Sequence, residues 1–398
     1  KEGGNGMRKG WEYKKLGEVG TFLRGKNILK SDFVEKGLPC IHYGQIHTKF
    51  GISTDTHLTE TSQEVYNKAI IASKNDVLIA ITSEDLEGSC KATAWLGDYD
   101  VAVSAHAAVF KHNLNPKYIV YYLKSQSFYI EKSKYARGFK VMEIKPTDIA
   151  KIPIPIPPKS TQLAIVSELD KINELIRLKK EQLKDFDNLA QSLFYEMFGD
   201  PVENEKGWEV KKLNDICDVR DGTHDSPKYL QNSEYILITS KNIVNGSIDF
   251  ENVNYISEED YIKINKRSKV DNGDIIMPMI GTIGNPIIAH IDGTHKFCIK
   301  NVALIKFLAD STVNNMFIVN LMRCSSFSSY LLNQNKGGTQ KFVALGAIRK
   351  LPIPLPPLSL QQLFAQRIEQ IEREKSEVQK SIQDLETLLA SRMQYWFE

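Results

Sequence analysis

Two unlike segments of the sequence each occur twice at nearly the same separation, and this duplication constrains the fold more than any other feature. Residues 10–16 (Gly-Trp-Glu-Tyr-Lys-Lys-Leu) recur at 207–213, with six of seven positions identical and an offset of 197. Residues 149–158, which contain Pro-Ile-Pro-Ile-Pro-Pro, recur at 348–357, with seven of ten identical and an offset of 199. This period is far longer than the roughly 20–50 residues of a solenoid repeat. The chain is therefore predicted to contain two copies of one domain.

Between these markers, short β-rich runs such as 77–81 and 235–239 alternate with turn residues and helical stretches. This pattern predicts α+β globular domains over residues 7–158 and 207–357. The loops of the two copies differ in sequence, so we expect two domains of one fold that each recognise something different. Residues 1–6 have no apolar core and precede Met7, and we expect them to be a cloning remnant.

Two long helices are predicted directly after the Pro-rich segments. Apolar residues in 165–197 and 364–396 follow alternating steps of four and three, the spacing of a coiled-coil seam. Neither stretch contains Pro or Gly, so each is expected to form one helix of about 35 residues, capped by Ser160 or Thr161 in the first copy and Ser359 in the second. The predicted seam comprises Ile165, Leu169, Ile172, Ile176, Leu183, Phe186, Leu193, Phe364, Ile368, Ile371, Val378, Ile382, Leu385 and Leu389.

The order of the segments predicts the direction of these helices. The first helical region with its linker, 159–206, precedes the whole second domain, and the second region, 358–398, follows it. If a pseudo-two-fold axis relates the halves, the helices run antiparallel. We therefore predict an α+β fold with two similar α/β domains, separated by two long antiparallel helices that form a coiled coil, in the shape of a dumbbell.

Motifs for independent catalysis are missing from the sequence. The Pro-Pro pairs at 157–158 and 356–357 lack the flanking polar and aromatic residues of an amino-methyltransferase motif, and no GxGxxG loop is present to hold a cofactor. Glu143-Ile144-Lys145 has the spacing of a nuclease Glu-x-Lys, but no suitably placed Pro-Asp precedes it. We expect a chain without catalysis or a cofactor of its own.

Charge and cysteine usage further restrict the class of protein to which the chain can belong. Lys+Arg 51 against Asp+Glu 49 excludes a uniformly basic nucleic-acid coat. The excess of positive charge lies in 7–158 (21 basic, 16 acidic) and 207–357 (17 basic, 15 acidic), so a nucleic-acid surface is expected on the globular domains. Five Cys without a CxxC pair indicate reduced cytosolic thiols. Cys40, His42 and His47 lack a fourth ligand, so no metal site is predicted, and no apolar run reaches the ~18 residues needed to span a membrane.

These features together resemble the specificity subunit of type I restriction-modification systems. The resemblance rests on the duplicated Gly-Trp-Glu-x-Lys-Lys-Leu starts, the duplicated Pro-Ile-Pro-x-Pro-Pro segments with a following Gln (Gln162; Gln361 and Gln362), and the link at 197–201, Met-Phe-Gly-Asp-Pro. It covers essentially the whole chain from residue 7. It implies that 7–158 and 207–357 are target-recognition domains that alternate with two conserved helical regions.

The same resemblance implies a non-catalytic, cytoplasmic subunit. Its expected partners are double-stranded DNA, two modification (methyltransferase) subunits and, through the complex, restriction (translocase–nuclease) subunits; no membrane is involved. S-adenosylmethionine, ATP and Mg are expected on the partner subunits only. Because the two sets of loops differ, the DNA target is expected to be bipartite and asymmetric. Helices of about 35 residues at ~1.5 Å each give roughly 52 Å, or about 15 base pairs, between the two parts.

DNA contacts are expected from loops that carry Lys, Arg, Asn, Gln, His, Ser and Thr, because basic groups bind phosphates and amides and hydroxyls read base edges. In the first domain the candidates are Lys26, Asn27, Lys30, Gln45, His47, Thr48, Lys49, Arg137 and Lys140. In the second domain they are His224, Asp225, Ser226, Lys228, Ser240, Lys241, Asn242, Thr339, Gln340 and Lys341.

Two other classes of function stay open from the sequence. One is a single-chain DNA methyltransferase or nuclease with unrecognised motifs, which binding of S-adenosylmethionine by the isolated chain would indicate. The other is a coiled-coil scaffold whose domains bind protein, which a salt-dependent, sequence-selective shift of DNA would exclude.

Overall fold

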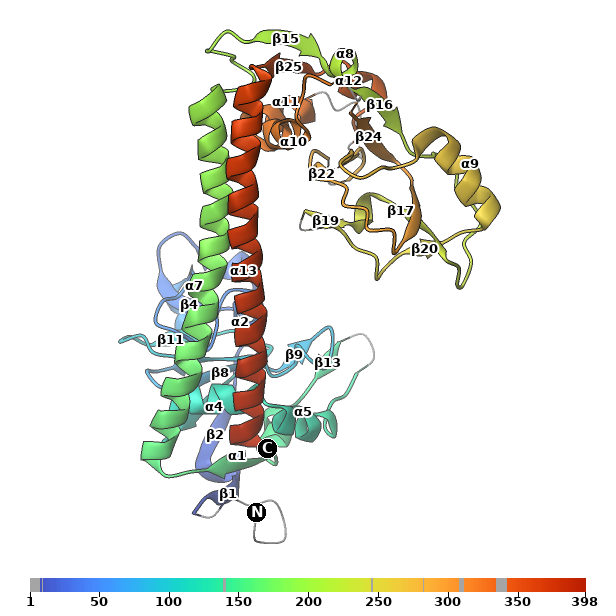
Figure 1. The fold of residues 1–398 in the computed structure, drawn as a ribbon. Helices are drawn as coiled ribbons and strands as arrows, with labels where there is room; N and C mark the ends of the chain where they lie inside the picture. The colour runs from blue at the N-terminus through green and yellow to red at the C-terminus, as the bar shows by residue number, and fades with distance from the viewer. Residues whose placement is uncertain are drawn as a thin grey trace. The chain divides into compact units, whose positions relative to one another are not determined.

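The chain folds into two compact units in the computed structural model, which describes residues 8, 10–138, 141–244, 246–281, 283–307, 311–333 and 342–398. The first unit consists of residues up to Lys179 together with Ser381–Glu398, and the second consists of Lys180–Lys380. Two long helices, α7 (Lys159–Phe198) and α13 (Leu358–Phe397), contribute a segment to each unit (Figure 1).

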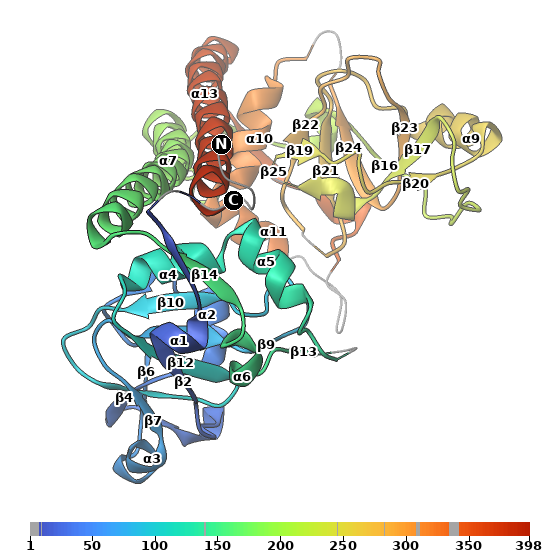
Figure 2. The same ribbon diagram turned by 90° about the horizontal axis from the view of Figure 1, so that it is seen from below.

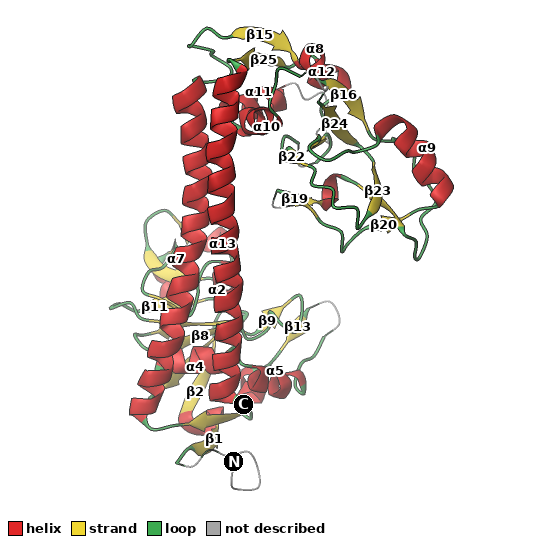
Figure 3. Cartoon of the chain, viewed as in Figure 1, coloured by secondary structure: helices red, strands yellow, loops and turns green. Residues whose placement is uncertain are grey.

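The globular domain of the first unit is a mixture of short strands and helices (Figure 3). Its elements are β1 (Glu12–Lys15), α1 (Leu16–Val19), β2 (Gly20–Arg24), η1 (Lys30–Asp32), β3 (Phe33–Val34), β4 (Leu38–Ile41), α2 (Tyr43–Thr48), β5 (Ser53–Thr54), β6 (Thr59–Thr61), α3 (Gln63–Lys68), β7 (Ile70–Ala72), β8 (Val77–Ala80), β9 (Thr82–Ser83), β10 (Ala92–Trp95), β11 (Val101–Val103), β12 (Ala107–His112), α4 (Pro116–Leu123), α5 (Gln126–Ser133), β13 (Met142–Glu143), α6 (Pro146–Ile149) and β14 (Pro153–Ile156).

Two sheets pack face to face in this domain. One has the strand order β2-β12-β8-β10-β5, and the other has the order β3-β6-β4-β11-β7. Alternate residues of β8 point to opposite sides: Val77 and Ile79 lie in a core with α4 and the long helices, whereas Leu78 and Ala80 lie in a core with β4 and β11. Figure 2 shows the resulting order of layers, with α4 on one side of β10 and with β4 and β7 on the other.

The globular domain of the second unit has a matching set of elements. They are β15 (Glu209–Lys212), α8 (Leu213–Ile216), β16 (Asp218–Asp221), β17 (Tyr235–Ile238), η2 (Ser240–Asn242), β18 (Ile243–Val244), β19 (Ser247–Ile248), β20 (Asn254–Tyr255), α9 (Glu258–Ser268), β21 (Ile275–Pro278), β22 (Ile287–Ile288), β23 (Lys296–Ile299), β24 (Val302–Lys306), α10 (Asn315–Arg323), α11 (Ser325–Asn333), α12 (Leu345–Arg349) and β25 (Pro352–Leu355).

Strand pairing confirms that the two domains are copies of one fold. The antiparallel neighbours β2-β12-β8 correspond to β16-β24-β21, and the parallel pair β4–β11 corresponds to β17–β23. The same layering recurs, because α10 and the long helices cover one face of β21 and β24 while β17 and β23 cover the other. The prediction of two similar mixed α/β domains, each followed by a long helix, is therefore confirmed.

The two duplicated sequence markers meet in each copy. β1 pairs antiparallel with β14, in a register that sets Tyr13 opposite Pro155 and Lys15 opposite Pro153, and β15 pairs with β25 in the same way. The Pro-rich segment is thus a strand that pairs with the start of its own domain. Pro at every second position is tolerated because only alternate residues of a strand donate to a given neighbour. The Tyr118 hydroxyl also donates to the Pro155 carbonyl at 2.7 Å.

A buried glutamine anchors the first turn of each long helix. Gln162 accepts a hydrogen bond from the Asn115 N–H at 3.1 Å and donates to the Pro157 carbonyl at 2.9 Å. Gln361 repeats both bonds, with the Asn314 N–H at 2.9 Å and the Pro356 carbonyl at 2.8 Å. The helices therefore begin directly after the Pro-Pro pairs and span 40 residues each, which is longer than predicted.

This start corrects the predicted helix caps. Ser160, Thr161 and Ser359 lie inside the first helical turn rather than before it. The reason is that the Pro158 carbonyl already accepts the Thr161 N–H at 2.9 Å, so the helix needs no later Ser or Thr cap.

The long helices run antiparallel in both units. In the first unit, Glu168 of α7 forms an ion pair with Arg392 of α13 and accepts from the Trp396 indole at 3.0 Å. In the second unit, Asp187 of α7 forms an ion pair with Lys375 of α13 at 2.8 Å. The predicted seam residues are all buried or half-buried. Within the described residues, no helix is long and apolar enough to cross a membrane.

The end of α7 departs from the regular seam. Phe194 and Phe198 are 1% and 3% exposed, whereas Leu193 and Met197, which continue the predicted spacing, are only half-buried. The two phenylalanine rings pack against Phe317 of α10 and Phe364 of α13, with ring centroids 4.9–5.6 Å apart. The register shifts because this end of α7 packs on the globular domain as well as on α13.

Candidate nucleic-acid interface

In the first unit, three loops meet where the parallel strands β4 and β11 end. Ile41 and Val103 are register partners at that end, and the Ser104 N–H donates to the Ile41 carbonyl at 3.1 Å. Lys26, in the loop after β2, bridges to Ser104, and the Lys26 N–H donates to the Val103 carbonyl at 3.3 Å. The Tyr43 N–H donates to Ser104 Oγ at 3.0 Å. The loops after β2, β4 and β11 therefore form one continuous edge.

The second unit repeats this edge with different residues. Ile238 and Ile299 are register partners at the ends of β17 and β23, and the Lys300 N–H donates to the Ile238 carbonyl at 2.9 Å. Thr223 bridges to Lys300, as Lys26 bridges to Ser104. We call both sets the carboxyl-edge loops; they comprise residues 25–30, 42–49 and 104–106 in the first unit, and 222–228, 239–242 and 300–301 in the second.

A glycine allows the close approach of backbones in each edge. A Cβ atom on Gly25 would lie 2.1 Å from the Ser104 carbonyl oxygen, and one on Gly222 would lie 2.3 Å from the Ile299 carbonyl oxygen. No other residue fits there without moving a strand end. The offset of 197 between the Gly-Trp-Glu markers also separates Gly25 from Gly222, so the sequence carried a signal for this pair.

One residue with a positive φ lies at the end of each edge, and neither residue was identified from the sequence as part of the site. His106 has φ 66° and directly precedes β12, and Asn301 has φ 56° and directly precedes β24. Non-glycine residues seldom adopt positive φ, and they concentrate at functional sites. The loop before β12 is one residue longer than the loop before β24, so neither repeat offset aligns His106 with Asn301.

Several predicted DNA-binding residues of the first unit lie exposed on this edge: Lys26, Asn27, Lys30, Thr48 and Lys49. Gln45 is used internally, because it accepts from the His42 N–H at 3.0 Å and donates to Thr59 at 3.2 Å. His47 Nε2 lies 2.9 Å from the Thr82 carbonyl oxygen, which ties α2 to β9.

Arg137 is joined to the same edge through the backbone. Its N–H donates to the Glu143 carbonyl at 3.2 Å, and β13, which contains Glu143, pairs with β9. Ile81, directly before β9, donates its N–H to the His106 carbonyl at 2.9 Å. The exposed Arg137 side chain therefore belongs to the surface around the edge. Lys140 lies outside the described residues.

In the second unit, His224, Asp225, Ser226, Lys228 and Lys241 are exposed, and Ser240 is half-buried. Lys300 donates to Ser226 Oγ at 2.5 Å, which links two of the loops. Asn242 is 3% exposed; its amide oxygen accepts from the Thr239 N–H at 3.0 Å and its amide nitrogen donates to the Asn252 carbonyl at 2.9 Å. Asn242 thus holds its own loop together. Thr339, Gln340 and Lys341 lie outside the described residues.

The two edges differ in their electrostatics. In the second unit, His224 Nδ1 lies 2.9 Å from Asn301 Oδ1, and Nε2 lies 2.8 Å from Asp221 Oδ2. The hydrogen bonds to Asn301 and then to Asp221 raise the pKa of His224. In the first unit, burial lowers the pKa of His42, and its proximity to Lys30 and His106 lowers that pKa further. One edge therefore favours a charged imidazole and the other a neutral one.

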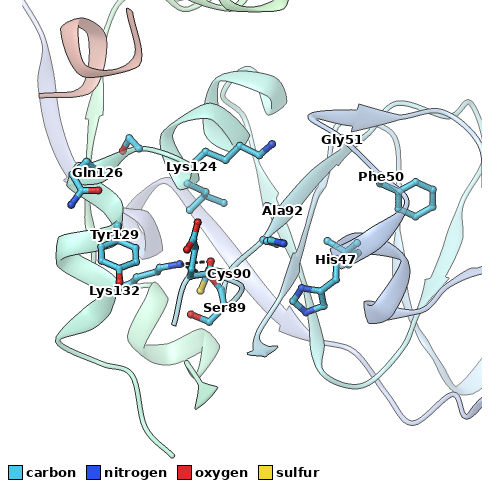
Figure 4. A pocket seen from close by; sticks show the side chains of 15 residues that line it. His47, Phe50, Gly51, Ser89, Cys90, Ala92, Lys124, Gln126, Tyr129 and Lys132 are labelled. Atoms are coloured by element: carbon cyan, nitrogen blue, oxygen red, sulfur yellow. Dashed lines mark hydrogen bonds between the residues drawn. The ribbon is translucent and has the colours of Figure 1, made fainter. Parts of the chain in front are cut away.

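A cavity of about 620 Å³ lies beside the edge of the first unit. Figure 4 shows His47 on one side of it and Gln126, Tyr129 and Lys132 on the other. Lys132 is 4% exposed, and its ammonium donates to the Ser89 carbonyl at 2.6 Å and to the Glu87 carbonyl at 3.2 Å. Burial lowers the pKa of Lys132. Its hydrogen bonds to these two carbonyl oxygens hold the loop between β9 and β10 in place.

The side chains first considered as metal ligands have other partners. Cys40 donates to Thr59 at 3.4 Å, burial raises the pKa of its thiol, and His42 Nδ1 accepts from the Gly44 N–H at 3.2 Å. Among the described residues, no group of three His, Cys, Asp or Glu side chains is arranged to hold a metal ion. The edges instead offer cations, amides and hydroxyls on exposed loops, which are the groups that bind nucleic acids.

Comparison with known proteins gives matches along nearly the whole chain. The type I restriction enzyme MjaVIII specificity subunit of Methanocaldococcus jannaschii is 22% identical over 412 residues, which cover 95% of this chain and 92% of that protein. The MjaIX specificity subunit of the same organism is 26% identical over 278 residues, which cover 64% of this chain and 62% of that protein.

Two solved structures share the fold. The S subunit of a type I restriction-modification system from M. genitalium aligns with a TM-score of 0.53 at 13% identity, covering 98% of this chain and 96% of that chain. A chain from a structure on complex assembly and conformational transition of a type I R-M system aligns with a TM-score of 0.61 at 17% identity, covering 98% of each chain.

A family model described as a type I restriction modification DNA specificity domain matches twice, at residues 8–185 and 205–387. Each match spans one globular domain and most of the long helix that follows it. This agrees with the duplicated markers, the repeated strand order and the repeated carboxyl-edge loops. The chain therefore belongs to the family of type I restriction-modification DNA specificity domains and carries two copies of that domain.

Proposed function

We propose that this chain is the specificity subunit of a type I restriction-modification complex, in which each set of carboxyl-edge loops reads one part of a bipartite, asymmetric site in double-stranded DNA. The observation that carries the proposal is a shared backbone with different side chains. The same glycine is followed by Lys26-Asn27 in the first unit and by Thr223-His224 in the second, and the left-handed position differs as well. Two copies that share a framework but carry different exposed groups are suited to reading different sequences.

The exposed groups divide by chemistry. Lys26, Lys30 and Lys49 in the first unit, and Lys228 and Lys241 in the second, are exposed cations and are assigned to phosphates, which position the protein without reading sequence. Amide and imidazole groups on the same edges are assigned to base edges. Gln45 and Asn242 are assigned to the framework because their amides are used internally.

The long helices are assigned the role of a spacer. At 40 residues each and ~1.5 Å per residue they are about 60 Å long, equal to about 18 base pairs of B-DNA. This length bounds the separation of the two parts of the target. An unread gap between those parts follows from the proposal.

Catalysis is assigned to partner subunits. In this proposal the chain acts in the cytoplasm, and its helices dock two modification (methyltransferase) subunits, through which restriction (translocase–nuclease) subunits join. S-adenosylmethionine, ATP and Mg are bound by those partners. The proposal is supported by the absence of an amino-methyltransferase Pro-Pro motif and of a GxGxxG loop from the sequence, and by relatives named specificity subunits.

The decisive experiment selects duplexes from a random DNA library with the full chain assembled with its modification subunits. We expect two short, different sequence elements at a fixed spacing, and binding that weakens with salt. The variant Lys26→Ala should lower affinity for all sequences and reduce the salt dependence by about one charge. Its matched control is Lys68→Ala, an exposed lysine on α3 that is not part of the carboxyl-edge loops.

The outcomes separate the competing functions. Selection of no DNA sequence, with capture of protein only, would overturn the proposal in favour of a scaffold. Methyl transfer by the chain free of modification subunit would overturn the assignment of catalysis to partners.

A further inference from the structure

A small, mostly apolar cavity lies beside the carboxyl-edge loops of the second unit. Its volume is about 220 Å³. Its lining includes Asp221, His224 and Asn301, together with Met279, Ile280 and Phe342. Ile280 and Phe342 are held side by side by an isolated antiparallel bridge. The bridge fixes the backbone on the apolar side of the cavity.

A chain of hydrogen bonds orients the amide of Asn301. His224 lies between Asp221 and Asn301, at 2.8 Å and 2.9 Å, and Asp221 is also paired with Arg267 of α9. The Asn301 atom that faces His224 Nδ1 in the structure is the amide oxygen, Oδ1. The Asn301 amide is therefore held with its oxygen on the His224 side.

The hydrogen-bonding capacity of this amide is only partly used. An amide oxygen has two lone pairs, and His224 takes one of them. The Asn301 backbone N–H donates to the Thr223 carbonyl at 3.2 Å, but within the described residues its side-chain amide nitrogen has no hydrogen-bond partner. One acceptor position and two N–H donors of the half-buried Asn301 side chain therefore remain unused beside the cavity.

We propose that this cavity reads an A·T base pair in the major groove, with Asn301 as the residue that specifies adenine. The Asn301 nitrogen donates to adenine N7, and the Asn301 oxygen accepts from the adenine N6 amino group. The apolar cavity beside Asn301 receives the C5 methyl group of the paired thymine. An A·T pair presents these features together in the major groove, whereas a G·C pair offers neither the N6 donor nor the methyl group.

Asp221, His224 and Arg267 are positioning residues in this scheme, because they act through Asn301. The equivalent position in the first unit is His106. The two nitrogens of an imidazole point in different directions, so His106 cannot donate to N7 and accept from N6 of one adenine at the same time. The reading of adenine by this device is thus assigned to the second unit alone. The inference rests on the proposed function and names one base pair within it.

The test uses the full chain in its complex and the duplex that the wild-type complex selects. In the half-site of the second unit, each adenine is replaced in turn by 7-deazaadenine, which lacks N7, and each thymine by deoxyuridine, which lacks the methyl group. At one A·T pair, both replacements should weaken wild-type binding, the first by roughly tenfold or more.

The main variant is Asn301→Gly, which removes the amide and still permits φ 56°. It should lose the preference for A·T at that one pair and should bind the 7-deazaadenine duplex as well as the normal duplex. Asn301→Asp should shift the preference toward cytosine, because a carboxylate accepts from the cytosine amino group. His224→Ala should weaken the preference without changing the base that is preferred.

The matched control is Asn75→Gly, an exposed asparagine with φ 74° before β8 in the first unit. It should leave every base preference unchanged. A complex that selects DNA and keeps its A·T preference and its 7-deazaadenine penalty after Asn301→Gly would overturn this inference and leave the proposed function intact. A complex that selects no sequence at all would overturn the proposed function itself.

Discussion

At the residue scale, the protonation of His224 affects the hydrogen bonds that hold the carboxyl-edge loops of the second unit. Three groups face it from separate elements: Asp221 of β16, Arg267 of α9, and Asn301 before β24. The first two carry opposite charges, and the bonds to Asn301 and Asp221 outweigh desolvation, so the pKa of His224 is raised above 6.5. A raised pKa in the folded state stabilises the fold below pH 6.5, and this stabilisation is lost as pH rises through the raised value.

This gives a prediction for stability. The free energy of unfolding of the wild type, relative to His224→Gln, should be largest below pH 6.5 and should shrink as the pH rises above it. Urea denaturation at several pH values checks the difference. His42→Gln serves as the comparison, because the pKa of His42 is lowered and its pH dependence must have the opposite sign. A difference for His224→Gln that grows with pH would contradict the charged network.

At the scale of elements, each long helix is joined to its domain by one buried glutamine. Gln361→Ala would leave the Asn314 N–H and the Pro356 carbonyl without their partner at a site that is 1% exposed. We expect a loss of about 1–3 kcal/mol in the free energy of unfolding. Gln362→Ala, on the exposed face of the same turn, is the control and should change stability by less than about 0.5 kcal/mol. Equal losses for the two variants would show that helix propensity, rather than the buried bonds, sets the effect.

The same elements show how far the sequence leads. The duplicated markers and the 4,3 spacing were sufficient to predict two similar α/β domains and two long helices. They did not predict the pairing of β1 with β14, because a Pro-rich segment looks unsuited to a ladder until its prolines are seen to alternate. They also missed Phe194 and Phe198, whose burial depends on α10, an element far away in sequence.

The residues of the candidate site also divide into those that the sequence could predict and those that it could not. Local composition identified exposed lysines such as Lys26 and Lys30, because exposure and charge are properties of a loop by itself. It also selected Gln45 and Asn242, whose amides are used internally, because hydrogen-bond partners depend on the folded chain. His106 and Asn301 were missed for a third reason, since a positive φ leaves little trace in a single sequence.

At the scale of the whole molecule, the length of the helices should control the spacing of the DNA target. Inserting four residues at equivalent points of α7 and α13 adds ~6 Å, or about two base pairs. We expect a longer gap with both half-sites unchanged, because the carboxyl-edge loops are untouched. Selection from a random library measures the gap. A changed half-site at an unchanged gap would contradict the role of the helices as a spacer.

Exchange of a whole domain tests the independence of the two copies. Replacing residues 207–357 by the matching domain of a relative should change one half of the target and leave the other half and the gap as they were. The physical reason is that β15 and β25 pair with each other, so the domain starts and ends at one joint. Library selection again provides the measurement, and a change in both halves would show that the two copies are coupled.

The pairing of β1 with β14 and of β15 with β25 has a consequence for genetics. Each domain is one uninterrupted stretch of the amino-acid sequence, and the two ends of that stretch form the two strands of a single joint. Recombination within these short, similar tracts would exchange everything between them and still rebuild a complete joint. Such an exchange would therefore give the chain one new recognition domain together with an intact joint.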